Sequence, residues 1–224
     1  METKILAWDI ETKPRLDLVK QFNTYDVADV KYGNAKDPVK RAKIEADHEI
    51  AFWQKKNDKA ALDPATAEVC AIGYQGAATI IDIRPSEKEM IEAFWQTYKD
   101  IDSGAREICS MVGWNIFGFD LPFLIKRSWI LGISIPRGVT NGRYYDKMFI
   151  DAKAEWNQWE YGWQMKAGLS QVAKLLNVHQ PRLHNVKGAN FSKVLETHYD
   201  KAHAYLSDDV QELYDIANRI LNNK

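Results

Sequence analysis

Asp9 and Glu11 are two carboxylates whose spacing suits metal-dependent chemistry. They stand two residues apart at the end of a short apolar run, residues 5–10, and strand alternation points both side chains to one face. Burying two like charges together is costly unless cations compensate, and a pair of divalent metals does this. The alternative is a strand that ends near Ile10 with Glu11 solvated, and this pair alone does not decide between the two.

Asp120 is a third candidate, at the start of a predicted helix over residues 120–131. An aspartate followed by Leu121 and Pro122 suits a helix N-cap, which is a purely structural role. A position just beyond a strand end is also where catalytic carboxylates are commonly placed. Both roles therefore remain open for Asp120.

Asp209 is the most informative acid, because helical spacing separates it from its neighbour Asp208. On a predicted helix over residues 202–222, Asp209 aligns with an apolar stripe, whereas Asp208 aligns with polar residues expected to face solvent. The apolar stripe is Leu213, Ile216 and Ile220, and the polar stripe is Glu212, Asp215 and Arg219. Ionised carboxylates are almost never buried unpaired, so Asp209 is expected to be functional. Tyr205 lies one turn earlier on the same face, where a core role is equally possible.

Strands and helices that could position these acids follow one another along the chain. After the first strand, strands are predicted over residues 68–74 and 78–83, joined as a hairpin, and over residues 107–114. We expect the first three to be antiparallel neighbours. Further helices are predicted over residues 86–101, 169–176 and 191–198, and residues 144–151 suit a short strand or a helical turn. This order predicts an α/β fold, a mixed β-sheet flanked by helices.

Residues 13–63 break this pattern and form a predicted, mostly helical insertion after the first strand. They carry 11 basic and 9 acidic residues. The clearest helix spans residues 38–56, with Asp37 as N-cap and Pro38 at its first position. We expect a single domain over residues 1–224 that contains this insertion.

The composition is that of an ordinary globular protein: 224 residues, 30 Lys plus Arg against 31 Asp plus Glu, and 46% hydrophobic residues. It excludes disordered, collagen-like and disulfide-scaffold proteins. No stretch has the roughly 20 apolar residues that span a bilayer, and no signal peptide is evident, so we expect an intracellular, cytoplasmic location. Cys70 and Cys109 lie singly in apolar runs, which favours buried reduced thiols over a zinc site.

Three segments in order resemble the motifs of the DEDD (DnaQ-like) 3′-to-5′ exonucleases. They are residues 8–12 (WDIET), residues 115–120 (NIFGFD) and residues 205–209 (YLSDD). Each motif is weak singly, but the ordered set in its strand and helix contexts is strong. The spacing of Tyr205 and Asp209 is similar to the tyrosine subclass (DEDDy), as in the proofreading domains of family B DNA polymerases.

This resemblance implies a ribonuclease H-like fold and a two-metal site for Mg²⁺ or Mn²⁺. Asp9 would bridge both ions, Glu11 and Asp209 would complete one, and Asp120 would hold the second. Tyr205 would position the attacking water. The implied substrate residues are Thr12, Asn115 and Phe119. Hard ions prefer carboxylates and water, and two of them can clamp the attacking and leaving oxygens of phosphodiester hydrolysis.

The implied activity is the release of nucleoside 5′-monophosphates from single-stranded nucleic acid 3′ ends, with DNA favoured. Because no polymerase domain follows Lys224, we expect proofreading, replication or repair to require a separate polymerase or replication protein. Discrimination between DNA and RNA depends on a 2′-OH contact that the sequence does not locate. The alternatives are a catalytically silent nucleic-acid-binding module of the same fold, and a scaffold protein whose acids are caps and surface groups.

The third motif has a second register, because His203 and Asp208 also fit the histidine subclass (DEDDh), which would suit an exoribonuclease. We favour the tyrosine register, since only Asp209 lies on the buried stripe.

A strand-contacting surface is predicted in the basic part of the chain. Residues 126–201 carry 12 basic and 6 acidic side chains. Aromatic and basic residues gather there: Trp156, Trp159, Tyr161 and Trp163, with Arg143, Lys147, Lys153 and Lys166. Bases of single strands stack on aromatic rings, although such rings more often belong to a core.

Overall fold

The computed structural model describes residues 4–105, 108, 110–139, 148–158, 167–178 and 185–222. The chain forms two compact units. The first runs to Glu11 and resumes at Val69, and the second comprises Thr12–Glu68.

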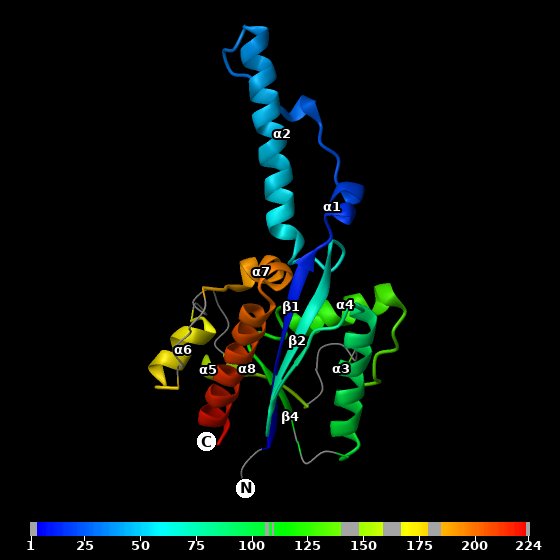
Figure 1. Ribbon diagram of the computed structural model, residues 1–224, viewed down its shortest axis with the longest axis vertical. Coiled ribbons are helices and arrows are strands. Elements are labelled where there is room, and N and C mark those ends of the chain that lie inside the picture. The colour runs from blue at the N-terminus through cyan, green and yellow to red at the C-terminus, as the bar shows by residue number, and fades with distance from the viewer. Residues whose placement is uncertain are drawn as a thin grey trace. The chain divides into compact units, whose positions relative to one another are not determined.

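A five-stranded mixed sheet forms the centre of the first unit, and its strands follow the order β3-β2-β1-β4-β5 (Figure 1). The strands are β1 (Ile5–Pro14), β2 (Ala67–Gln75), β3 (Thr79–Asp82), β4 (Ser110–Gly113) and β5 (Phe149–Asp151). β1 pairs in parallel with β4, and β4 with β5, whereas β2 and β3 form an antiparallel hairpin. The predicted α/β class and the hairpin are confirmed.

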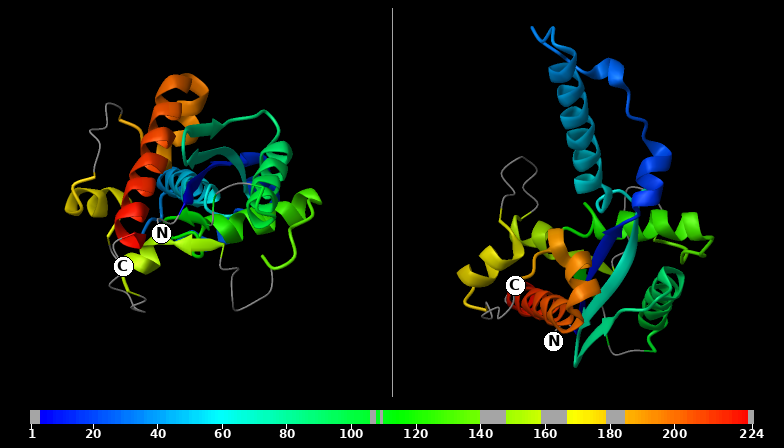
Figure 2. Two further views of the ribbon diagram at one scale, coloured as in Figure 1. Left: turned by 90° about the horizontal axis from the view of Figure 1, so that it is seen from below. Right: turned by 45° about the horizontal axis from the view of Figure 1, so that its top comes forward.

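Helices α3 (Glu87–Asp102) and α8 (Tyr199–Leu221) cover opposite faces of this sheet (Figure 2). Ile5 and Ala7 of β1 pack with Leu213 of α8 in one buried cluster. Trp8 faces the other way, and its ring centroid lies 4.8 Å from that of Phe94 on α3. Because side chains alternate along a strand, the odd-numbered residues of β1 face α8.

The remaining helices of this unit are α4 (Asp120–Leu131), α5 (Ala152–Trp156), α6 (Leu169–Leu175) and α7 (Phe191–Thr197), with a 3₁₀ turn, η2, at Gly188–Asn190. Helix α8 contacts α5, α6, α7 and two strands, so it is the central support of its face. Gly73 of β2 allows close approach, since a Cβ there would lie 2.8 Å from side-chain carbons of Leu206 and Val210. The predicted helices are confirmed, with Ser86 capping α3 as expected.

A buried ion pair ties α4 to α3. Arg127 and Glu87 are almost fully buried, and the guanidinium donates to both carboxylate oxygens at 2.8 and 2.6 Å. The same carboxylate accepts from the Val69 amide at 2.8 Å. This pair therefore also fixes the start of β2.

The second unit is mostly helical, as its composition predicts. It contains α1 (Leu16–Phe22), the 3₁₀ turn η1 (Val27–Asp29) and α2 (Pro38–Ala60), which Asp37 caps. The Tyr32 hydroxyl donates to Glu45 of α2 at 2.6 Å. Among the residues that the structure describes, no helix is long and apolar enough to cross a membrane.

Candidate functional site

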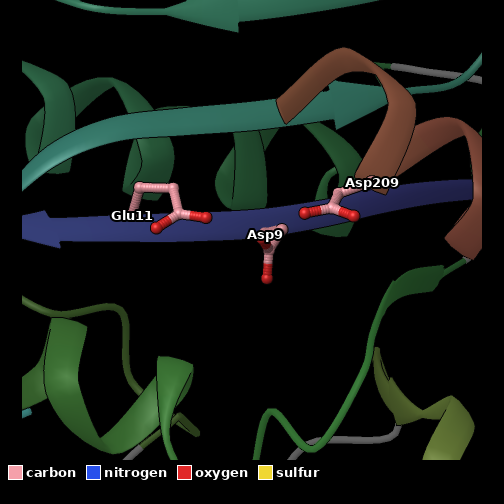
Figure 3. A group of neighbouring side chains, drawn as sticks. All are labelled: Asp9, Glu11 and Asp209. Atoms are coloured by element: carbon pink, nitrogen blue, oxygen red, sulfur yellow. The ribbon is translucent and has the colours of Figure 1, made fainter. Parts of the chain in front are cut away.

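Three of the predicted acids meet at one place in the first unit. One carboxylate oxygen each from Asp9, Glu11 and Asp209 lies within 4.8 Å of the others. In Figure 3, Asp9 lies between Glu11 and Asp209; Asp9 and Glu11 belong to β1, and Asp209 belongs to α8. Glu11 and Asp209 are buried, at 8% exposure each, and Asp9 is half-buried. The alternative of a solvated Glu11 is wrong, because β1 continues to Pro14.

Asp120 lies beside this cluster at the first residue of α4 and is buried at 3% exposure. Its carboxylate accepts from its own amide and from the Ile10 amide, which also donates to Asp9. The residue before α4 is Phe119, which makes no side-chain cap bond. Asp120 therefore faces the acidic strand instead of serving as an ordinary N-cap.

Burial and neighbouring carboxylates disfavour the ionised forms of Asp9 and Glu11. Burial, and then the charges of Asp120, Glu11 and Asp209, hold the pKa of Asp9 well above its usual range. Burial and the charges of Asp209 and Asp120 do the same to the pKa of Glu11. Burial raises the pKa of Asp120 to about 7. Such a cluster is short of positive charge, which a divalent cation would supply.

Tyr205 lies one turn before Asp209 on α8 and hydrogen-bonds to its carboxylate. It is buried, its ring centroid lies 5.8 Å from that of Phe191, and both belong to one core cluster. Burial and the charges of Asp209 and Glu11 raise the pKa of the Tyr205 hydroxyl. The residue is thus both a core aromatic and a member of the acidic site.

His203 and Asp208 lie elsewhere on α8. Both are half-buried, and the His203 ring packs against Tyr199, with centroids 6.1 Å apart. Because α8 begins at Tyr199, His203 is part of the continuous helix and does not share the face of Asp209.

The prediction that Glu212 faces solvent is wrong. Glu212 is fully buried, and the Ser170 hydroxyl of α6 lies 3.5 Å from its Oε2. Helix α8 is covered by α6 as well as by the sheet, so its buried arc is wider than one apolar stripe.

The loop between β4 and α4 carries Asn115 and Phe119, both half-buried. Asn115 adopts a left-handed backbone, with φ of 63°, and its Oδ1 lies 3.4 Å from Lys153 Nζ. The Phe119 ring packs on Phe123, with centroids 5.4 Å apart. The predicted substrate roles of both residues stay predictions.

Asp151, at the end of β5, anchors this loop, and sequence reasoning missed it. Its carboxylate accepts from the amides of Asn115 at 2.9 Å and Phe117 at 3.4 Å, and it caps α5 through the amides of Lys153 and Ala154. Its place between a strand and a helix could have indicated the helix cap. No local signal in the sequence indicates its contact with Asn115, which lies 36 residues away.

We expect Asp151→Ala to lower the free energy of unfolding by about 2 to 4 kcal/mol, because it removes a helix cap and leaves the half-buried amides of Asn115 and Phe117 without their acceptor. Urea unfolding of the metal-free protein measures this. Ser86→Ala, which removes only the cap of α3, is the matched control and should cost about 1 kcal/mol. A loss in Asp151→Ala no larger than in the control would contradict the anchoring role.

Thr12 belongs to the second unit, where its hydroxyl donates to the Ala61 carbonyl at 2.6 Å. The substrate role of Thr12 stays a prediction.

Cys70 is buried, and its thiol lies 3.4 Å from the Glu11 backbone carbonyl. Cys109 lies outside the described residues.

Most of the predicted strand-contacting surface lies outside the described residues: Trp159, Tyr161 and Trp163, with Arg143, Lys147 and Lys166. Trp156 is described, and it packs against the core cluster formed by Val172, Ala173 and Ile216. For Trp156, the structure thus favours a packing role.

The fold is that of the ribonuclease H-like α/β proteins. The structure resembles that of the family B DNA polymerase from the hyperthermophilic archaeon Pyrobaculum calidifontis, with a TM-score of 0.62 and 16% sequence identity. The similarity covers 97% of this chain but only 24% of the polymerase chain. A comparison with curated proteins finds no match.

Residues 68–220 match the model of a family described as "Predicted 3'-5' exonuclease related to the exonuclease domain of PolB". The match covers more than half of the chain, so the protein belongs to this family. The matched segment contains Asp120, Tyr205 and Asp209, whereas Asp9 and Glu11 precede it.

Proposed function

We propose that this protein is a metal-dependent 3′-to-5′ exonuclease of the tyrosine subclass that hydrolyses single-stranded DNA to nucleoside 5′-monophosphates. The main support for this proposal is that Asp9, Glu11 and Asp209 lie together next to Asp120, in a chain that belongs to the exonuclease family. We further propose one exonuclease domain, with residues 13–63 as its insertion.

The donor set fits two hard divalent cations. Carboxylates without a thiolate or imidazole match the oxygen preference of Mg²⁺ and Mn²⁺. Asp9, Glu11 and Asp209 would hold one ion, and Asp9 with Asp120 would hold the other. When bound, such ions stabilise the charge on the attacking and leaving oxygens of phosphodiester hydrolysis.

The chain's own residues then orient the reactants. The Tyr205 hydroxyl, held by its hydrogen bond to Asp209, would direct the attacking water toward the phosphorus. Phe119 and Asn115, on the loop that Asp151 anchors, would hold the terminal nucleotide. Correct orientation of this kind can contribute several powers of ten in rate.

A preference for single strands follows from the burial of the acids. A terminal nucleotide must leave its duplex to reach them, which costs a few kcal/mol for unpairing and unstacking. We therefore expect frayed or single-stranded 3′ ends to be cut faster than blunt duplex ends.

Digestion of a 5′-labelled DNA oligonucleotide with Mg²⁺ or Mn²⁺ tests polarity. The expected result is a ladder of labelled products that shortens with time, because nucleotides leave from the unlabelled 3′ end. Immediate release of the label as a mononucleotide would show the opposite polarity, and binding without cleavage would identify a silent module. An RNA strand of the same sequence is the matched substrate that decides the sugar preference.

A further inference from the structure

We propose that Gly188 keeps open the space in which the attacking water and the scissile phosphate meet Tyr205. A Cβ built on Gly188 would lie 3.7 Å from the Tyr205 hydroxyl oxygen and 3.9 Å from Glu11 Oε2. The side of Gly188 that lacks a side chain therefore faces both Tyr205 and Glu11, to which the proposed reaction assigns roles. This inference rests on the proposed function and adds a residue to it.

The position of Gly188 is fixed by the residues around it. Val186 and Phe191 flank the turn and are buried in the core cluster that also contains Tyr205. Within the turn, the Asn190 amide donates to the Lys187 carbonyl at 2.9 Å, and the Lys187 amide donates to Asn190 Oδ1 at 2.7 Å. The turn is therefore anchored on both sides, while Gly188 itself is exposed.

The backbone does not require glycine at this position. The φ angle of Gly188 is not positive. The distances of 3.7 and 3.9 Å from the added Cβ to the Tyr205 and Glu11 oxygens are ordinary van der Waals contacts. An alanine therefore fits the protein without a clash. A water that hydrogen-bonds to the Tyr205 hydroxyl or to Glu11 Oε2 must lie within about 3 Å of that oxygen. The methyl group of an alanine at position 188 would therefore displace solvent or substrate from beside these two oxygens.

Gly188→Ala is expected to separate catalysis from stability. The kcat should fall by about 10- to 10²-fold, because a displacement on the order of 1 Å is sufficient for such a loss. The KM, the affinity for a 5′-labelled oligonucleotide in EDTA, and the rise of Tm with Mn²⁺ should stay at wild-type values. The Tm of the metal-free variant should be equal or higher, because alanine restricts the unfolded chain. Gly188→Val should lower kcat further.

Gly168→Ala is the matched control. Gly168 also lies at the N-terminal boundary of a short helix, with φ of −76°, but no atom lies within 4 Å of a Cβ built there. Its kcat should equal that of the wild type.

Any of the following results would overturn the inference. A Gly188→Ala variant with wild-type kcat would show that the space is not used, and a change confined to KM would assign it to binding alone. A lower Tm or a lost Mn²⁺ response would show a structural role. An active wild type with an equally active Gly188→Ala overturns this inference alone, whereas a wild type inactive under all metal conditions overturns the proposed function and this inference together.

Discussion

Asp9→Asn is expected to lower metal-dependent exonuclease activity by about 10³-fold or more, because it removes the carboxylate that would contact both cations. The same substitution should stabilise the metal-free protein, since burial and then the charges of Asp120, Glu11 and Asp209 disfavour the ionised Asp9 carboxylate. A loss of activity combined with a gain of stability is not the result expected from removing a structural residue.

The gain in stability depends on pH. The pKa of Asp9 is higher in the folded protein than in the unfolded chain, so its contribution to stability is fully present below the unfolded pKa and is lost as pH rises through the folded pKa. Asn does not ionise and avoids this loss. The difference between variant and wild type should therefore be small near pH 4 and largest at neutral pH and above.

Thermal unfolding in EDTA at several pH values measures this difference. A gain on the order of 1 to 2 kcal/mol corresponds to a rise in Tm of about 2 to 8 °C for a chain of this size. Asp102→Asn, which removes an exposed charge at the end of α3, should change neither Tm nor activity. Substantial residual activity of Asp9→Asn in a pure preparation would remove Asp9 from the site.

Local periodicity was sufficient to predict most of the fold and the face on which each acid lies, whereas the meeting of the acids was implied by the resemblance to the DEDD exonucleases. Strand alternation places Asp9 and Glu11 on the face that Ile5 and Ala7 present to α8. Helical spacing places Asp209 on the buried face of α8, together with Leu213, which packs against β1. The pattern thus identified the buried face of each element, and the resemblance supplied the expectation that these two faces pack on each other.

The missed features depend on contacts between distant segments. Asp151 bonds to a loop 36 residues away, and Gly188 lies beside Glu11 only after α8 has packed on the sheet. Glu212 was assigned to solvent because a single sequence does not show that α6 covers a second side of α8. Periodicity identifies one buried face of a helix, but not the number of neighbours that bury it.

Tyr205→Phe is expected to slow the chemical step by about 10- to 10²-fold, since it removes the hydroxyl that orients the attacking water while the ring still packs against Phe191. His203→Ala should have little effect, because His203 faces away from Asp209 on the continuous helix α8. Single-turnover rates at saturating Mg²⁺ or Mn²⁺ measure the chemical step directly.

The two adjacent aspartates give a matched pair for the same question. Asp209→Asn should lower the rate by about 10³-fold, because Asp209 is buried with Asp9 and Glu11. Asp208→Asn removes the same charge one residue away, outside that cluster, and should resemble the wild type. In the histidine register the pattern is reversed, and loss of His203 as general base would cost about 10² to 10⁴ in rate. A severe defect in His203→Ala and Asp208→Asn beside near-normal Tyr205→Phe and Asp209→Asn would transfer the metal ligand from Asp209 to Asp208.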